Sequence, residues 1–294
     1  MKDIGGTEEV GSIGGQSVSV VVPVRDGLPW IDEQLRALAG QQCDADWEVV
    51  VADNGSTDGT RATVEDWAVR HPHIRLVDAS GRPGPAAARN TGVAAASGQM
   101  LAFCDADDVV QPGWLTACVE VLARADAAAG TFDFTSLNGG PISSPVVAAT
   151  RQLAFLPAAL GANLCVRRTA FEAVGGFTED LAVGEDIDLS WRLQLRGFRF
   201  VVAADAVVAK REPIEPRLVF RAAWSYGQSG PVLYRRFRKS GMGRDLKGAV
   251  KEWAWLAVAW PGLVDIGWRR RWMRTFGVRG GRLAESVNQR VFFP

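Results

Sequence analysis

Cysteine and histidine, the residues that often build metal centres, are scarce in this 294-residue chain, which has four cysteines and two histidines. No two cysteines form a Cys-x-x-Cys pair, and His71 and His73 lie far along the sequence from all of them. These spacings argue against a zinc site, and four cysteines in so long a chain do not indicate a disulfide framework. We therefore expect reduced, mostly buried thiols.

Long apolar segments are also missing. Residues 1–16 are polar and Gly-rich and contain no apolar core of a signal peptide, so we expect a loose leader there and a cytoplasmic protein. The most apolar segment, Trp253–Trp268, has 16 residues and contains Pro261 and Asp265. A membrane-spanning helix needs about 20 apolar residues, so the sequence does not predict a span.

The net charge is zero, but the charges are unevenly distributed. From Lys210 to Pro294 there are 18 Lys and Arg against 6 Asp and Glu, so residues 1–209 carry the opposite excess. An acidic body with a basic C-terminal part indicates two different partners. The hydrophobic content of 47% is enough for a globular domain with a full core.

Valine-rich runs alternate with helical patterns through the first two-thirds of the chain. This alternation predicts right-handed βαβ units and a parallel sheet that helices cover on both faces. A composition shift towards Arg and Trp places a boundary near residue 212. The predicted strands are 17–26, 47–53, 74–79, 99–104 and 127–134, with a strand pair over 198–212. Residues 162–177 are predicted to form a strand, a helix and a turn, and the main predicted helices are 29–41, 60–71, 84–98, 114–126 and 184–197.

Acidic residues stand where these strands end. They occur at Arg25–Asp26, Asp53–Asn54, Asp78 and Asp105–Asp108. Because ligands of open α/β sheets bind outside the carboxyl ends of the strands, we expect these residues to share one rim.

The segment Asp105–Asp108 reads Asp-Ala-Asp-Asp. Alternate residues of an extended chain point the same way, so Asp105 and Asp107 should face one cleft, with Asp108 pointing away or capping the next turn. Neighbouring carboxylates bind hard divalent cations, which in turn bind phosphate oxygens. Taken alone, however, the four residues also fit a solvated acidic turn.

Three further segments favour a binding site. Asp53 is placed to hydrogen-bond a base or ribose, and Arg89 lies on a helix beside the Asp105 strand. Glu185 and Asp186 form a second carboxylate group, separate from the first, and a general base needs such a separate group.

Together these segments resemble the inverting glycosyltransferases of family 2. In family order the matching segments are VSVVVPVRD, VVVADNGSTDGT, GPAAARNTGVAAASG, MLAFCDADD, VGGF and GEDIDLSWRLQLRGFRF, over about residues 17–211. The resemblance implies a GT-A fold with a single Rossmann-like, doubly wound, mostly parallel sheet over 17–212. It also implies a nucleoside-diphosphate sugar donor, a Mg²⁺ or Mn²⁺ ion, and transfer to an acceptor hydroxyl with inversion.

The resemblance further implies residue roles. Asp186 would be the catalytic base and Glu185 would orient the acceptor, while Asp107 would be the main metal ligand and Asp105 the second. The implied donor-binding residues are Pro23, Arg25, Asp26, Asp53, Arg89 and Asp105.

Two positions leave alternatives open. Family members often carry a histidine after the last strand, but here the residues are Ala209–Lys210–Arg211, so Lys210 either faces the diphosphate or is an ordinary surface lysine. Trp191 either matches a frequent family tryptophan or packs in the core.

Residues 213–294 are expected to form a helical extension. Trp253, Trp255, Trp260, Trp268 and Trp272, with Arg269–Arg271, fit a helix in a membrane interface. The protein would then be peripheral on the inner face of the cell membrane, with a glycan or lipid-linked acceptor in cell-envelope polysaccharide or glycolipid synthesis. Alternatively the segment packs on the catalytic domain or on a second subunit. No nucleic-acid-binding module is recognisable, so nucleic acid is not an expected partner.

Other functions fit the sequence less well. A nucleotidyltransferase should carry a Gly-rich loop with Lys or Arg after the first strand, and PVRDGLPW is a poor match. A non-catalytic sugar-nucleotide-binding protein would not need the carboxylates of GEDID. A dehydrogenase should show G-x-G-x-x-G after the first strand, which this chain does not have.

Overall fold

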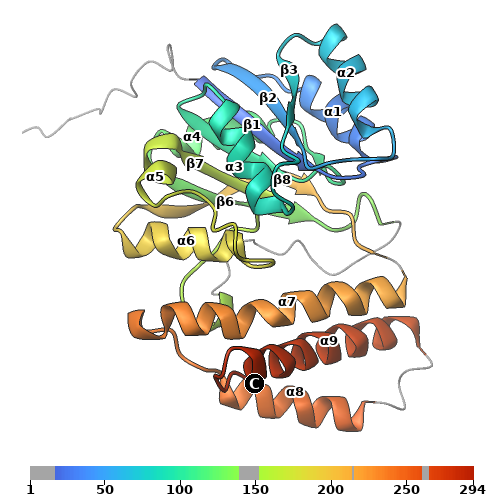
Figure 1. The fold of residues 1–294 in the computed structure, drawn as a ribbon, viewed down its shortest axis with the longest axis vertical. Helices are drawn as coiled ribbons and strands as arrows, with labels where there is room; N and C mark the ends of the chain where they lie inside the picture. Colours follow the sequence, from blue (N-terminus) through green and yellow to red (C-terminus); the bar gives the residue numbers. More distant parts are fainter. Residues whose placement is uncertain (1–16, 139–151, 214, 260–264) are drawn as a thin grey trace, which may run out of the picture.

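The computed structural model describes residues 17–138, 152–213, 215–259 and 265–294, so the expected leader lies outside the described part (Figure 1). Within these residues an eight-stranded sheet has the order β3-β2-β1-β4-β7-β6-β8-β5. The strands are β1 (Ser17–Val24), β2 (Asp46–Asp53), β3 (Ile74–Asp78), β4 (Met100–Cys104), β5 (Val109–Val110), β6 (Ala127–Asp133), β7 (Asn163–Arg167) and β8 (Phe200–Ala209).

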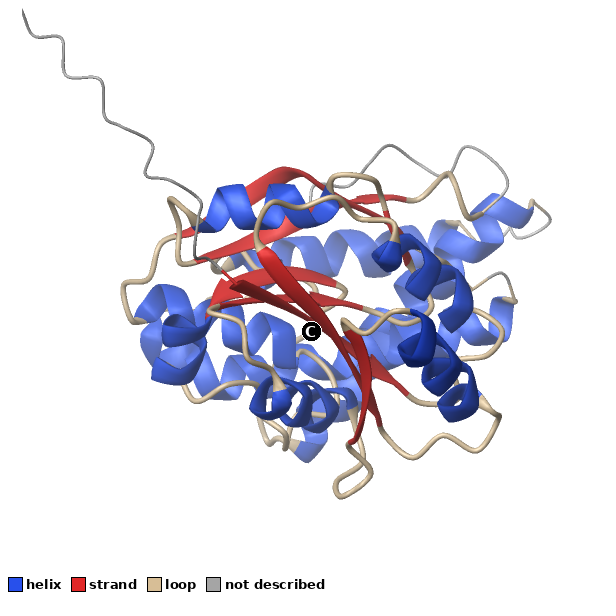
Figure 2. Ribbon diagram, turned by 90° about the horizontal axis from the view of Figure 1, so that it is seen from above, coloured by secondary structure: helices blue, strands red, loops and turns tan. Residues whose placement is uncertain are grey.

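The first four strands form the parallel half of the sheet. β1 lies between β2 and β4 and pairs in parallel with both. Its valines Val20, Val21 and Val22 are fully buried because helices cover both faces of the sheet, as Figure 2 shows. The helices of this half are α1 (Ile31–Ala39), α2 (Thr60–Arg70) and α3 (Pro85–Ala95), whereas α4 (Trp114–Leu122) packs mainly on β8. The predicted mostly parallel sheet with helices on both faces is confirmed.

The second half of the sheet is mixed. β7 runs antiparallel to both β4 and β6, whereas β6 and β8 are parallel. The strand pair predicted over 198–212 is wrong: these residues form the single strand β8, whose register against β6 shifts between Ala129 and Thr131. Such an irregularity bends a long strand without a turn, so it leaves no turn signal in the sequence.

A smaller core joins the sheet domain to the helices that follow it. Helix α6 (Glu185–Leu195) buries Trp191 completely, and this ring makes edge contacts with Phe155 and Phe237 at centroid distances of 5.0 and 5.2 Å. The Trp191 indole N–H donates to the Leu156 carbonyl at 2.9 Å. Trp191 is therefore a core residue. The short helix α5 (Arg168–Ala173) directly follows β7 in the chain.

The C-terminal helices α7 (Pro216–Phe237), α9 (Ile266–Asn288) and α8 (Leu246–Val258) are stacked below the sheet, with α7 nearest to it (Figure 1). α7 and α9 touch backbone to backbone at glycines. A Cβ on Gly227 would lie 2.2 Å from the Val278 carbonyl oxygen, and one on Gly281 would lie 2.2 Å from that of Trp224. Only glycine fits at these contacts.

All four cysteines are free thiols, and Cys104, Cys118 and Cys165 are buried, as expected. Residues 139–151 and Trp260 lie outside the described part. Among the described helices, none combines the length and the apolar character that crossing a membrane requires.

Candidate active site

An open cavity of about 620 Å³ lies at the carboxyl ends of β1 and β4. Its position follows from the strand order, which sets these two strand ends side by side. The segment around Gly161, the N-terminus of α6 and one face of α7 complete the wall. The site residues expected from the sequence that line it are Pro23, Arg25, Asp26, Arg89, Asp105, Asp107, Glu185 and Asp186.

Asp53 does not line this cavity. Its side chain is fully buried, and it accepts hydrogen bonds from the Ser56 backbone N–H at 3.2 Å and from Arg61 Nη1 at 2.7 Å. Its neighbour Asn54 lines the cavity instead, and the Asn54 Oδ1 atom accepts from the Gly84 N–H at 2.8 Å. The contact between Asp53 and the base stays a prediction.

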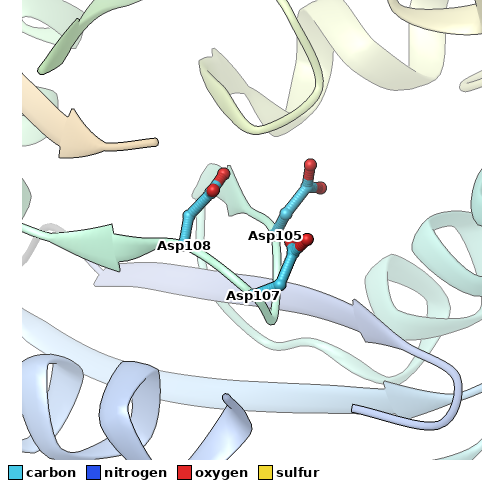
Figure 3. A group of neighbouring side chains, drawn as sticks. All are labelled: Asp105, Asp107 and Asp108. Atoms are coloured by element: carbon cyan, nitrogen blue, oxygen red, sulfur yellow. The ribbon is translucent and has the colours of Figure 1, made fainter. Parts of the chain in front are cut away.

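The three aspartates after β4 form one cluster. Asp105, Asp107 and Asp108 each offer a carboxylate oxygen, and these oxygens lie within 4.8 Å of one another (Figure 3). Asp108 therefore does not point away. β4 ends at Cys104 and the chain turns at residues 106–107, so the alternation of an extended strand does not apply here.

Lys210 belongs to this cluster and is not a surface lysine. Its Nζ lies 2.7 Å from Asp108 Oδ2 and 3.4 Å from Asp105 Oδ2, and 19% of its side chain is exposed. The Arg211 backbone N–H donates to the other Asp108 oxygen at 2.9 Å. Burial disfavours the ammonium charge, but the charges of Asp105, Asp108 and Asp107 outweigh it and raise the pKa of Lys210 above its ordinary value.

Arg89 connects the acidic cluster with the second carboxylate group. Its Nη2 lies 2.9 Å from Asp105 Oδ1 and its Nη1 lies 2.7 Å from Glu185 Oε1. The side chain is 4% exposed, and a Cβ on Gly161 would lie 2.7 Å from Nη2. Gly161 is therefore what allows the guanidinium to pass between the two groups.

Asp186 lies in the first turn of α6, which begins after Gly184 (φ +86°). Its Oδ2 accepts from the Gly161 N–H at 2.8 Å and its Oδ1 from the Ile187 N–H at 2.7 Å. Burial raises the pKa of Asp186, and the hydrogen bond from Gly161 partly opposes the rise. Burial also raises the pKa of Glu185, with Asp186 adding to the rise. A carboxylate with a raised pKa is the stronger general base.

The donor set fits a hard divalent cation. Asp107 is exposed and makes no ion pair within the described residues, where Lys210 pairs with Asp105 and Asp108 instead. The cavity wall carries more carboxylates than cations. Five carboxylates line it against three cations: Asp26, Asp105, Asp107, Glu185 and Asp186 against Arg25, Arg89 and Lys210. Carboxylate oxygens with this surplus of negative charge are what Mg²⁺ and Mn²⁺ prefer.

Two residues of the wall could not be found from the sequence. Tyr226 (59% exposed) and Ser229 line the cavity from α7, which lies beyond the expected domain boundary. No motif marks either residue, because α7 reaches the cavity only through its packing: a Cβ on Gly184 would lie 2.9 Å from Ser229 Cβ.

Comparison with known families gives two matches. Residues 100–280 match the family described as glycosyl transferase family group 2, and residues 19–160 match glycosyl transferase family 2.

Individual relatives are similar over most of this chain. The glycosyltransferase AglE of Haloferax volcanii is 30% identical over 198 residues, which are 65% of this chain and 65% of AglE. The pre-mycofactocin glycosyltransferase of Mycobacterium tuberculosis is 28% identical over 261 residues, 83% of this chain but 53% of that protein. The chain thus spans between half and two-thirds of the length of these relatives.

Solved structures share the fold. The mannosyltransferase PcManGT of Pyrobaculum calidifontis, in complex with GDP-Man and Mn²⁺, superposes with a TM-score of 0.66 at 22% identity and covers 92% of this chain and 87% of its own. S. aureus TarS 1–349 in complex with UDP-GlcNAc gives 0.54 at 20% identity, with 95% and 93% covered. These likenesses confirm the GT-A fold.

Proposed function

This chain belongs to the family 2 glycosyltransferases, and on that premise we propose that it transfers a sugar from a nucleoside-diphosphate donor to an acceptor hydroxyl, with a divalent metal ion and with inversion. One observation carries the proposal: Arg89 joins an acidic cluster and a separate Glu185–Asp186 pair on the wall of one cavity. The matched families and relatives favour this activity over nucleotidyl transfer and over simple sugar-nucleotide binding.

The donor end of the site is assigned to the rim of the parallel strands. Asp107 and Asp105 would hold Mg²⁺ or Mn²⁺, which supplies positive charge against the negative charge of the leaving diphosphate. Pro23, Arg25 and Asp26 line the cavity next to these carboxylates and are placed to hold the nucleoside. The complexes of PcManGT with GDP-Man and Mn²⁺ and of TarS with UDP-GlcNAc support a donor of this kind.

The acceptor end is assigned to the start of α6. Asp186 takes the proton from the acceptor hydroxyl as its oxygen bonds to the anomeric carbon and the bond to the diphosphate oxygen breaks. A single displacement on the opposite face inverts the configuration. The two backbone N–H donors fix the Asp186 carboxylate, while Glu185, held by Arg89, orients the acceptor.

A donor screen tests the proposed function. We expect one member of a panel of UDP-, GDP- and dTDP-sugars, added with Mn²⁺, to stabilise the protein and to release its nucleoside diphosphate slowly. At 100 times Kd the stabilisation is about 2.7 kcal/mol, which raises Tm by roughly 5 °C. The matched control is the same panel with EDTA. If no donor stabilises the protein or is hydrolysed with metal present, the proposed function is wrong.

We also propose that the outer surface of α8 and α9 contacts an anionic membrane. The exposed apolar side chains of these helices include Val250 (69% exposed) and Val258 (73%) on α8, and Ile266 (65%) and Trp268 (47%) on α9. A groove of about 550 Å³ between the two helices is lined by the basic residues Lys251, Arg271, Arg274 and Arg282. Apolar residues beside clustered positive charge suit a surface with phosphate headgroups.

The tryptophans of this region divide into two groups. Trp253 and Trp272 pack on Phe276 at centroid distances of 6.5 and 5.0 Å, inside the helical bundle. Trp255 stacks on Trp268, which is itself half exposed. The membrane proposal therefore rests on Trp268 and its aliphatic neighbours rather than on all five predicted tryptophans.

Sedimentation with lipid vesicles tests this surface. The protein should co-sediment with vesicles that contain phosphatidylglycerol at low salt and be released by high salt. The double variant Ile266→Ser with Trp268→Ser should bind at least tenfold more weakly, because two apolar side chains no longer enter the interface. Val69→Ser, at a valine on α2 that is more exposed (84%) than either residue, is the control and should bind normally. Equal sedimentation of both variants would exclude this surface.

A further inference from the structure

The sheet fixes the backbone position of Lys210. β5 pairs antiparallel with β8 so that Val109 lies opposite Ala209. The next pair in that register is Asp108 with Lys210. The Lys210 backbone N–H donates to the Asp133 carbonyl at 2.8 Å, and its carbonyl accepts from Asn138 Nδ2 at 2.8 Å. The backbone therefore places the Lys210 side chain beside the acidic cluster.

The two contacts of the ammonium group are unequal. Nζ lies 2.7 Å from Asp108, which is fully buried and also held by the Arg211 N–H, but 3.4 Å from Asp105, which lies on the cavity wall. The Asp108 contact is an anchor, since a buried carboxylate without a partner is costly. The longer contact to Asp105 is the one that another cation can displace.

We propose that Lys210 is a resident cation of the metal site, which competes with the metal ion for Asp105 in the empty enzyme and contacts the diphosphate in the donor complex. This inference rests on the proposed function for its donor. Lys210 lines the same cavity as Asp105 and Asp107. A diphosphate bound there would lie within reach of its ammonium group, because the lysine side chain has a flexible stem of four carbons. Its single positive charge adds to that of the metal and does not leave with the product.

Two measurable consequences follow, and neither needs turnover. In the absence of nucleotide, Mn²⁺ must bind against the repulsion of a nearby ammonium group, so the site should be weak. In the absence of metal, a nucleoside diphosphate still meets one fixed positive charge, so some affinity should remain. An ion pair that served only to neutralise buried Asp108 would leave the diphosphate affinity in EDTA unchanged when Lys210 is replaced.

The test compares Lys210→Met, which removes the charge, with Lys210→Arg, which keeps it, and with Lys247→Met at an exposed position of α8 as the matched control. Mn²⁺ affinity without nucleotide is measured by electron paramagnetic resonance, and affinities for UDP and GDP in EDTA by calorimetry. For Lys210→Met we expect about tenfold tighter Mn²⁺ binding and about tenfold weaker diphosphate binding in EDTA. Lys210→Arg should keep the diphosphate affinity, and Lys247→Met should change neither value.

Unchanged or weaker Mn²⁺ binding by Lys210→Met, or unchanged diphosphate affinity in EDTA, would overturn the inference. If Lys210→Met does not fold, the double variant Lys210→Met with Asp108→Asn removes the unpaired buried charge and is compared with Asp108→Asn alone, so that the lost carboxylate is common to both; the same changes are expected between these two variants. The inference and the proposed function fail separately. If the donor screen finds a donor but Lys210→Met keeps the wild-type affinities, only the inference about Lys210 is wrong. If Lys210→Met binds Mn²⁺ more tightly but no donor is found, only the proposed transferase function is wrong.

Discussion

Replacing Asp186 with Asn should lower the rate of sugar transfer by about 10²- to 10⁴-fold, the usual contribution of a general base, and leave donor affinity within about twofold. The amide keeps the size of the carboxylate, so it does not block the cavity, but it cannot accept the proton of the acceptor. The donor contacts assigned to Asp105 and Asp107 lie on another wall of the cavity and are untouched. The measurement is release of nucleoside diphosphate, with water or acceptor, from the donor found in the screen.

The wild-type pH profile gives an independent sign. A base works only when it has lost its proton, so the rate should rise with pH as Asp186 ionises. Because burial raises the pKa of Asp186, this acid limb should lie above the range of an ordinary aspartate, and it should be absent from the variant. The amide can keep only one of the two backbone hydrogen bonds, to Gly161 or to Ile187, so Tm is measured in parallel. Transfer at the wild-type rate by a folded Asn variant would show that another group is the base.

Replacing Asp107 with Ala should abolish the gain in donor affinity that metal provides, a loss of about 100-fold or more. The affinity measured with Mn²⁺ should then fall to the value measured in EDTA. Asp107 is exposed and makes no ion pair among the described residues, so its loss costs the fold little and removes mainly a ligand. Calorimetric titration of the donor, with and without Mn²⁺, is the measurement.

Asp44→Ala is the matched control, because Asp44 is an equally exposed aspartate in the loop between α1 and β2 and does not line the cavity. It should keep the full effect of metal. Undiminished metal-dependent affinity in Asp107→Ala would remove Asp107 from the metal site, whatever the fate of the Asp186 assignment.

The parallel half of the fold was predictable because its signals are local. A valine run such as that of β1 is buried on both faces, and the polar residues after it mark the carboxyl end. Once the strands alternate with helices, Arg25 and Asp105 must meet at one rim, and the structure places them in one cavity. The other residues of the candidate site were predicted from the order of the motifs along the chain.

The parts that could not be predicted depend on contacts between distant segments. The turn after Cys104 brings Asp108 back to the cluster, and the β5–β8 register brings Lys210 to Asp108 from 102 residues away. Neither the geometry of this turn nor the strand register can be predicted from the residues that are adjacent in the sequence. The same holds for Tyr226, which belongs to the site only because α7 packs against the start of α6.

The glycine contacts between α7 and α9 have a consequence for the choice of acceptor. The α7 and α9 backbones touch at Gly227 and Gly281, so no side chain lies between them that could move and let one helix shift against the other. The helix that carries Tyr226 is therefore held to the helix that carries Trp268. With the proposed membrane contact, this rigid pair of helices would set the distance between the catalytic cavity and the bilayer on which α8 and α9 rest. An acceptor anchored in that bilayer would be selected first by length, because its hydroxyl has to rise to Asp186 before any sugar contact can favour it.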